Sequence, residues 1–181
     1  VGTAPPDDVR IQNNLVYDTT TDALPVDATT MGPNGNGVGI NVGRATNVVV
    51  AHNTVVSCEG ACIYITPQAE GVEVVNNVIV SGTGTEFGAV PSDLLPGGEV
   101  EFHHNLLYDG LSSAPGRVNS QAIDLTIWPD SLDSDPLFLD AVGGDSHLQS
   151  ASSAIDAGQD AGTLDDRDGV ARDASPDFGA Y

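Results

Sequence analysis

Short carboxylates crowd the end of this sequence, and carboxylates are the groups that bind hard cations such as Ca²⁺. The densest run is DDRDG, in which Asp165, Asp166 and Asp168 precede Gly169; the run shares the D-x-D-G core of an EF-hand loop. The run lacks the glutamate that completes such a loop, and its internal Arg167 is suited to pair with an aspartate. Two interpretations stay open: a Ca²⁺ site, or a turn held by a salt bridge. Ca²⁺ is the one cofactor that the sequence suggests.

The two cysteines, Cys58 and Cys62, are the next candidates for chemistry. Their CxxxC spacing has no matching second pair, so a zinc site is not expected. In an oxidising compartment we expect a local disulfide across a turn, which closes a small loop and adds little stability. The alternative is a pair of small core residues.

The overall charge excludes several functions. The chain has 26 acidic residues against five arginines and no lysine, which gives a formal net charge of −21. Binding to nucleic acids or to anionic membranes is therefore not expected. There is also no run of apolar residues long enough to span a membrane.

A repeated motif indicates how the chain folds. Four valine-rich runs align on a polar pair, and the second members of the pairs are Asn14, Asn53, Asn77 and Asn105. The first members are Asn13, His52, Asn76 and His104. Self-similarity at unequal spacings of this size indicates a solenoid with loop insertions. We expect equivalent residues to stack roughly 4.8 Å apart, so that the polar pairs form a ladder that turns the chain and joins its coils.

The elements around the polar pairs read as strands. Val and Ile dominate, and no helical stripe is present. A shorter strand precedes the later pairs, within 37–42, 61–65 and 86–90. We expect an all-β domain of about four to five coils over residues 1–132, with insertions at 19–36 and 83–99. We expect residues 133–181 to form an irregular, Asp-rich C-terminal cap of the same domain.

The repeat and the tail together resemble a known family. The φxφxNNφφφ units are similar to right-handed parallel β-helix repeats of pectate-lyase-like proteins. The segments SDPLFLD, SAIDAG, DRDGVAR and DFGAY resemble the closing part of secreted bacterial β-helix proteins, many of which continue into a cell-surface anchor. The resemblance implies a right-handed parallel β-helix solenoid that is secreted or at a bacterial cell surface.

We expect this chain to be the C-terminal portion of a longer protein, because no first strand precedes Val9. An open coil exposes unpaired backbone groups and apolar side chains. We therefore expect a partner there: an upstream or N-terminal chain, or self-association end to end. The alternative is that residues 1–8 and 19–36 fold over the open end.

Family resemblance also suggests where catalysis would occur. Lyases of this fold need a base and a cation, and the weak candidates are Arg44, His103 and Arg117. Hydrolases of the fold use clustered aspartates, and no such pair lies on a repeat strand. His52 and His104 precede the anchors and are interpreted as ladder members.

Three functions follow as expectations. The first is an extracellular structural or surface scaffold, which the strands favour because they carry mainly Val, Asn and Thr. The second is the C-terminal part of a polysaccharide lyase or glycoside hydrolase that acts on acidic polysaccharide. The third is a calcium-dependent glycan-binding module. Fold alone does not decide among them.

Overall fold

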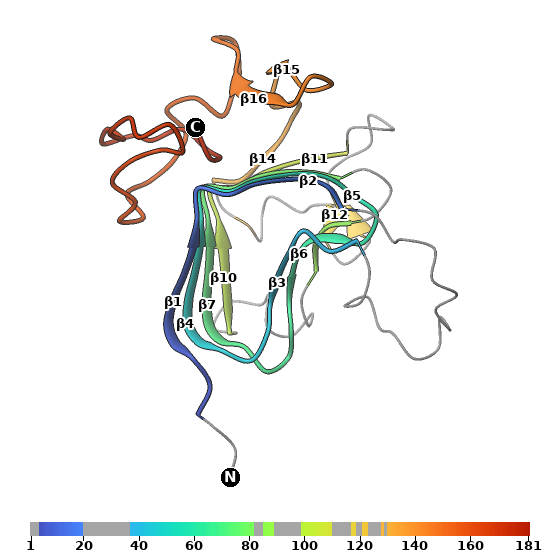
Figure 1. Ribbon diagram of the computed structural model, residues 1–181, viewed down its shortest axis with the longest axis vertical. Helices are drawn as coiled ribbons and strands as arrows, with labels where there is room; N and C mark the ends of the chain where they lie inside the picture. The colour runs from blue at the N-terminus through green and yellow to red at the C-terminus, as the bar shows by residue number, and fades with distance from the viewer. Residues whose placement is uncertain are drawn as a thin grey trace.

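The computed structural model describes residues 4–19, 37–81, 85–88, 99–109, 117–118, 121–122, 128 and 130–181. In these residues the chain forms strands and turns only (Figure 1). None of them forms a helix that could cross a membrane. Apart from one two-stranded hairpin, the strands build three mainly parallel sheets, and through four rounds the chain passes through the first, second and third sheet in the same order.

The first sheet contains the strands that lead into the polar pairs. Its order is β1 (Asp7–Gln12), β4 (Thr46–Ala51), β7 (Glu70–Val75), β10 (Val100–His103). Neighbours are parallel, and their register pairs the residues that the sequence alignment matches, such as Val9 with Val48 and Val48 with Val72. Alternate residues face inward, and Val48, Val50, Val72 and Val74 are almost completely buried.

The second sheet contains the strands that leave the polar pairs. Its order is β2 (Leu15–Thr19), β5 (Thr54–Cys58), β8 (Val78–Ser81), β11 (Leu106–Asp109), β14 (Leu132–Asp133). These strands are apolar on both faces, as expected of parallel strands that are covered on both sides. One face turns Val55, Ile79 and Leu107 into the core, and the other turns Val78 and Leu106 toward the C-terminal segment.

The third sheet contains the short strands. Its order is β3 (Ile40–Val42), β6 (Ala61–Ile65), β9 (Thr85–Gly88), β12 (Arg117–Val118), β13 (Gln121–Ala122). The last pair, β12 and β13, is antiparallel and so departs from the parallel pattern. Most of the expected insertions at 19–36 and 83–99 lie outside the described residues.

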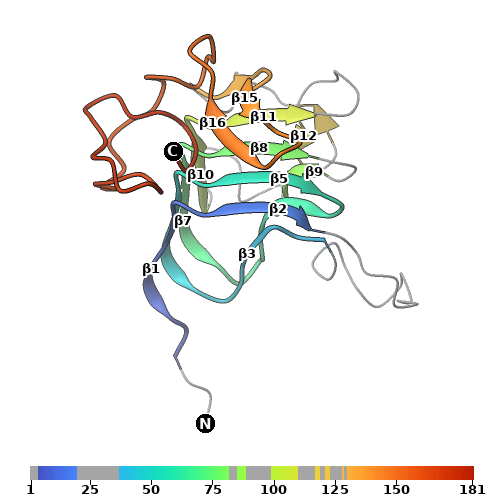
Figure 2. The same cartoon turned by 45° about the horizontal axis from the view of Figure 1, so that its top comes forward.

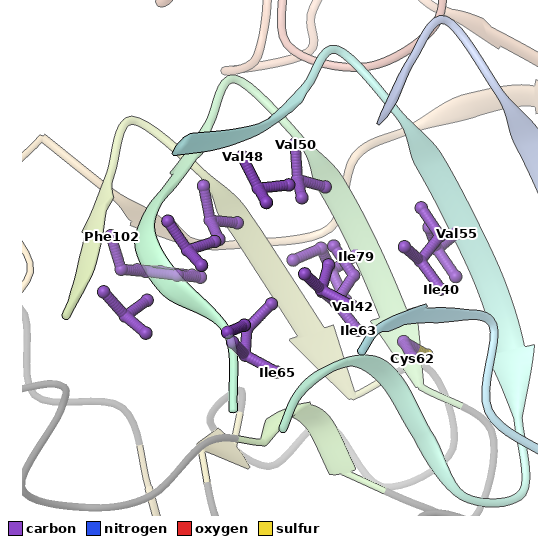
Figure 3. Close-up of a cluster of buried hydrophobic side chains, with 14 of the residues drawn as sticks. Ile40, Val42, Val48, Val50, Val55, Cys62, Ile63, Ile65, Ile79 and Phe102 are labelled. Carbon is purple, nitrogen blue, oxygen red and sulfur yellow. The ribbon is translucent and has the colours of Figure 1, made fainter. Parts of the chain in front are cut away.

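The core lies between the three sheets (Figure 3). Each sheet contributes branched aliphatic side chains, and Cys62 lies among them. At the far end Trp128 packs edge-on against Phe102, with ring centroids 5.9 Å apart. The core is therefore continuous from the first round of strands to the last.

Residues 134–181, called here the C-terminal segment, lie outside the corner between the first two sheets (Figure 2). Beyond β14 the segment has one antiparallel hairpin, β15 (Phe138–Asp140) with β16 (Asp145–Leu148), and is otherwise irregular. A cap would cover the end of the stack of strands. This segment instead covers its side, because the outer face of the second sheet is apolar and Phe178 packs on it.

Candidate functional site

The corner between the first and second sheets contains the polar pairs. The first residue of every pair has a left-handed backbone, with φ of 56° at Asn13, 52° at His52, 57° at Asn76 and 49° at His104. Asparagine and histidine tolerate this conformation better than most residues. We call these four residues the corner column. They make the turn between the sheets, whereas the sequence assigned the turn to the pair as a whole.

The second residues of the pairs form a continuous row of side-chain hydrogen bonds. Asn14 Nδ2 donates to Asn53 Oδ1 at 2.9 Å, Asn53 Nδ2 to Asn77 Oδ1 at 2.9 Å, and Asn77 Nδ2 to Asn105 Oδ1 at 2.8 Å. Each Oδ1 also accepts the backbone N–H of the preceding member. Asn53, Asn77 and Asn105 are fully buried, so these bonds satisfy amides whose burial would otherwise be unfavourable. We call this set the asparagine row.

The corner column points outward, where its side chains hold the C-terminal segment. Asn76 pairs with the backbone of Gln159 twice, because Nδ2 donates to its carbonyl at 2.7 Å and Oδ1 accepts its N–H at 3.1 Å. Asn13 Nδ2 donates to the carbonyl of Asp165 at 2.6 Å. The C-terminal segment has few strands. The side chains of the corner column therefore supply hydrogen bonds to its backbone that strand pairing would supply in a sheet.

His52 is a fully buried polar link in this contact, with no exposed surface. Its Nε2 lies 2.9 Å from Asn76 Nδ2, and the two bonds of Asn76 to Gln159 fix that nitrogen as a donor. Nε2 must then accept, so Nδ1 carries the proton and donates to the carbonyl of Asp177 at 3.2 Å. Burial, with the nearby charge of Arg172, lowers the His52 pKa to about 3. His52 is therefore neutral at ordinary pH.

Arg172 ties the end of the chain to the same corner. Its guanidinium donates to the carbonyl of Gly179 at 2.9 Å and to Asn13 Oδ1 at 3.2 Å, with longer bonds to the carbonyls of Asp177 and Tyr181. Burial lowers its pKa, and Asp166 and Asp177 oppose this shift. Sequence reasoning missed this role. The available signal was its place at the end of the DRDGVAR motif.

The last residues also pack closely against the second sheet. Phe178 is 1% exposed and contacts the cluster that contains Val78 and Leu106. Gly179 has a φ of 92°, and a Cβ there would lie 2.7 Å from Thr54 Oγ1 and 3.1 Å from Val78 Cγ2. The backbone approaches the sheet so closely at this position that only glycine fits.

The expected calcium residues form a turn. Asp166 Oδ1 accepts the backbone N–H groups of Asp168 and Val170 at 2.9 and 2.8 Å. Asp168 Oδ2 lies 3.0 Å from His147 Nε2, and Asp165 joins Ala171 in an isolated antiparallel bridge. Among the described residues, no group of three or more His, Cys, Asp or Glu side chains is arranged to hold a metal ion. The Ca²⁺ site stays a prediction.

The disulfide expected between Cys58 and Cys62 is not formed. Both residues are buried thiols, 0% exposed, in the core. Cys58 ends β5 in the second sheet, and Cys62 lies on β6 in the third sheet, where its Sγ donates to the carbonyl of Val80. The two side chains pack as small apolar core groups, which is the alternative that the sequence left open.

The weak catalytic candidates do not meet in one site. Arg44 is exposed before β4 begins, whereas His103 lies at the end of β10, in register with Val75 and thus with Ala51 at the end of β4. His103 pairs instead with Glu73 at 3.5 Å and with His104 at 3.1 Å. The side chain of Arg117 lies outside what the structure describes.

His104 differs from the rest of the corner column. It has the same left-handed backbone, and its Nε2 lies 3.8 Å from Asp130 Oδ2. Burial lowers its pKa, against the attraction of Asp130. His104 therefore lies at the last turn of the column, and its partner Asp130 lies just before β14.

A groove of about 250 Å³ lies between the second sheet and the β15–β16 hairpin. Tyr17 and Asp18 line one side, and Phe138 and the loop around Gly143 line the other. Tyr17 is 58% exposed, and Asp18 has a left-handed backbone with a φ of 53°. The groove thus combines an exposed aromatic ring with a carboxylate.

Comparison of the sequence with models of known protein families found no match, and comparison with curated proteins found no similar sequence.

Proposed function

We propose that this chain is a structural scaffold, built as a right-handed parallel β-helix whose C-terminal segment is clamped along its side. The strand order supports the solenoid, since each of the first four rounds of the chain adds one parallel strand to each of the three sheets. Parallel strands joined by crossovers are right-handed in nearly all proteins. The tail motifs support a secreted or cell-surface protein of bacterial origin.

The observation that carries this proposal is that the polar side chains of the corner are bonded within the chain itself. The polar side chains of this corner that could bind or react with a ligand, His52, Asn76 and Arg172, instead form hydrogen bonds with the backbone of the chain itself. The asparagine row is likewise satisfied within the stack. Groups that are fixed in this way increase rigidity, which is what a scaffold needs.

The test is a turnover assay on the folded chain. Acidic and neutral polysaccharides are incubated with the protein, and reducing ends and unsaturated products are measured. The scaffold proposal predicts no product, together with a folded chain by near-ultraviolet circular dichroism. Product formation would contradict it and would favour the polysaccharide lyase or glycoside hydrolase alternative.

A second candidate, a glycan-binding module, is favoured by the groove beside Tyr17. An exposed aromatic ring next to a carboxylate suits a sugar, which has an apolar face and hydroxyl groups. The test is glycan binding with Ca²⁺ and with chelator, on wild type and on Tyr17→Ala. Leu139→Ala is the matched control, because Leu139 is equally exposed, at 58%, and does not line the groove. Loss of binding in Tyr17→Ala alone would support this candidate.

A further inference from the structure

The first round of strands forms an open edge. β1, β2 and β3 each lie at the end of their sheet's strand order, so among the described residues each is paired on one side only. Core side chains on this round are also less covered. Val9, Ile11 and Val16 are partly buried, whereas their register partners Val48, Val50 and Val55 are 0% exposed. We call the outer sides of these three strands the open edge.

The side-chain amides of the asparagine row all have the same orientation, and this orientation predicts which groups can bind at the open edge. Asn53, Asn77 and Asn105 each receive two donations at Oδ1 from the preceding round, one from a backbone N–H and one from Nδ2. In return, the Nδ2 of each donates to a carbonyl of that preceding round, as Asn53 does to Ile11 at 2.9 Å. The pattern is the same at every internal step.

Asn14 begins the row and is exposed. Its Nδ2 donates to Asn53 Oδ1 and to the carbonyl of Gln12, and its N–H donates to Asn53 Oδ1. Its Oδ1 accepts no hydrogen bond from the described residues. By the pattern of the internal steps, this oxygen is placed to accept a backbone N–H and an amide Nδ2 from one more round of parallel strands.

The opposite end of the row is closed. Ser131 takes the place of a fifth asparagine, because its Oγ accepts the N–H of Asn105 at 3.2 Å, and it is 5% exposed. β14 then pairs with β11, and Trp128 covers the core beside Phe102. Among the described residues, the far end of the row therefore offers no asparagine donor to the Asn14 of a second copy.

Pairing of two open edges is disfavoured as well. A twofold axis would set β1 antiparallel to its copy and bring the acidic start of one strand, at Asp7 and Asp8, beside the Asn14 acceptor of the other. The net charge of −21 on each chain adds repulsion. The occupant must therefore be a donor, and it must run parallel to β1 and β2.

We propose that the open edge is a docking surface for one further parallel coil from a partner polypeptide, whose corner asparagine donates to Asn14 Oδ1. This inference rests on the proposed β-helix scaffold. The partner carries alternating apolar residues that cover Val9, Ile11 and Val16, and a polar corner pair like those of this chain. Recognition is by strand addition, with the asparagine setting the register.

The test uses a peptide copied from this chain, GVEVVNNVIVS, which is residues 71–81 with two lysines added for solubility. A scrambled peptide with the same lysines is the control. Binding to the full chain is followed by fluorescence anisotropy, and the site is mapped by hydrogen exchange. We expect saturable binding and new protection of the amides of β1 and β2.

Two substitutions separate the acceptor from general damage. Asn14→Ala and Asn14→Asp both remove the Nδ2 donor to Asn53, but only Asn14→Ala removes the acceptor oxygen. We expect Asn14→Ala to weaken peptide binding by about tenfold and Asn14→Asp to keep it. Equal affinity of both variants, protection at β14 instead of β1, or no binding would overturn the proposal.

Sedimentation without peptide adds one more outcome. A chain that self-associates and protects β1 on its own would also overturn the proposal, since the occupant would then be a second copy. The scaffold proposal has a separate readout. A folded chain with no turnover that fails to bind the peptide would contradict only the docking inference.

Discussion

At the corner between the first two sheets, the two adjacent residues of each polar pair have different structural roles. The first adopts a left-handed backbone, and its side chain points out to the C-terminal segment. The second points inward and joins one round of strands to the next. His52 belongs to the first class, and burial forces it to stay neutral and to act as both donor and acceptor.

The neutral state of His52 predicts a pH dependence. Its pKa is about 3 in the folded chain and near 6.5 when unfolded, so the unfolded state binds more protons between these values. The stability that this group contributes is complete above about pH 6.5 and decreases as the pH falls toward about 3, by on the order of a few kcal/mol.

His52→Asn is the variant that tests this dependence. Asparagine already occupies the equivalent positions 13 and 76 with the same backbone conformation. Urea unfolding of both proteins, from neutral pH to about pH 4, should show a smaller loss of unfolding free energy in the variant. Identical losses in the two proteins would mean that His52 is not held neutral.

At the scale of elements, the sequence predicted the strands well. The aligned runs became register partners, and the short strands in 37–42, 61–65 and 86–90 appear as β3, β6 and β9. Period-two patterning and the repeat are local signals, and the sequence shows them directly.

The contacts of the C-terminal segment were not predictable in the same way. They join residues such as Asn76 and Gln159, which are far apart in the chain and share no pattern. Arg172 donates mostly to backbone carbonyls. Every residue type has a backbone carbonyl, so no pattern of residue types in the sequence indicates which residues Arg172 contacts. The disulfide expectation failed for a similar reason: CxxxC spacing does not tell which way the two side chains point.

The close approach of the segment to the second sheet predicts a specific sensitivity at Gly179. Gly179→Ala adds a Cβ against Thr54 and Val78 at a positive φ, so we expect a loss of about 2 kcal/mol or more. Gly144→Ala is the matched control, because φ there is also positive, at 83°, and nothing lies within 4 Å of the added Cβ. Thermal unfolding measures both. A similar cost in the two variants would mean that strain alone, and not packing on the sheet, acts at Gly179.

At the scale of the whole molecule, acidic charge dominates the surface. Aspartates concentrate in the C-terminal segment, and many accept local backbone hydrogen bonds, as Asp166 does. Such a segment repels itself unless cations or hydrogen bonds offset its charge. Binding of Ca²⁺ to the folded chain would raise its stability by mass action.

The calcium prediction is tested by thermal unfolding with chelator and with added Ca²⁺. If Asp165, Asp166 and Asp168 hold the ion, chelation lowers the melting temperature, Ca²⁺ restores it, and Asp168→Asn abolishes the difference. An unchanged melting temperature would mean that these residues serve only as a hydrogen-bonded turn, linked to His147 through Asp168.

The central claim is that the asparagine row joins the stack of strands into one unit, and Asn77 lies in its middle. Urea unfolding of Asn77→Ala measures this most directly, because the substitution removes bonds to Asn53, Asn105 and the carbonyls of Val50 and Val75. Asn41→Ala, an exposed asparagine on β3, is the control. We predict a loss of about 1–3 kcal/mol for Asn77→Ala and little change for Asn41→Ala. Equal stability of the two variants would contradict the account.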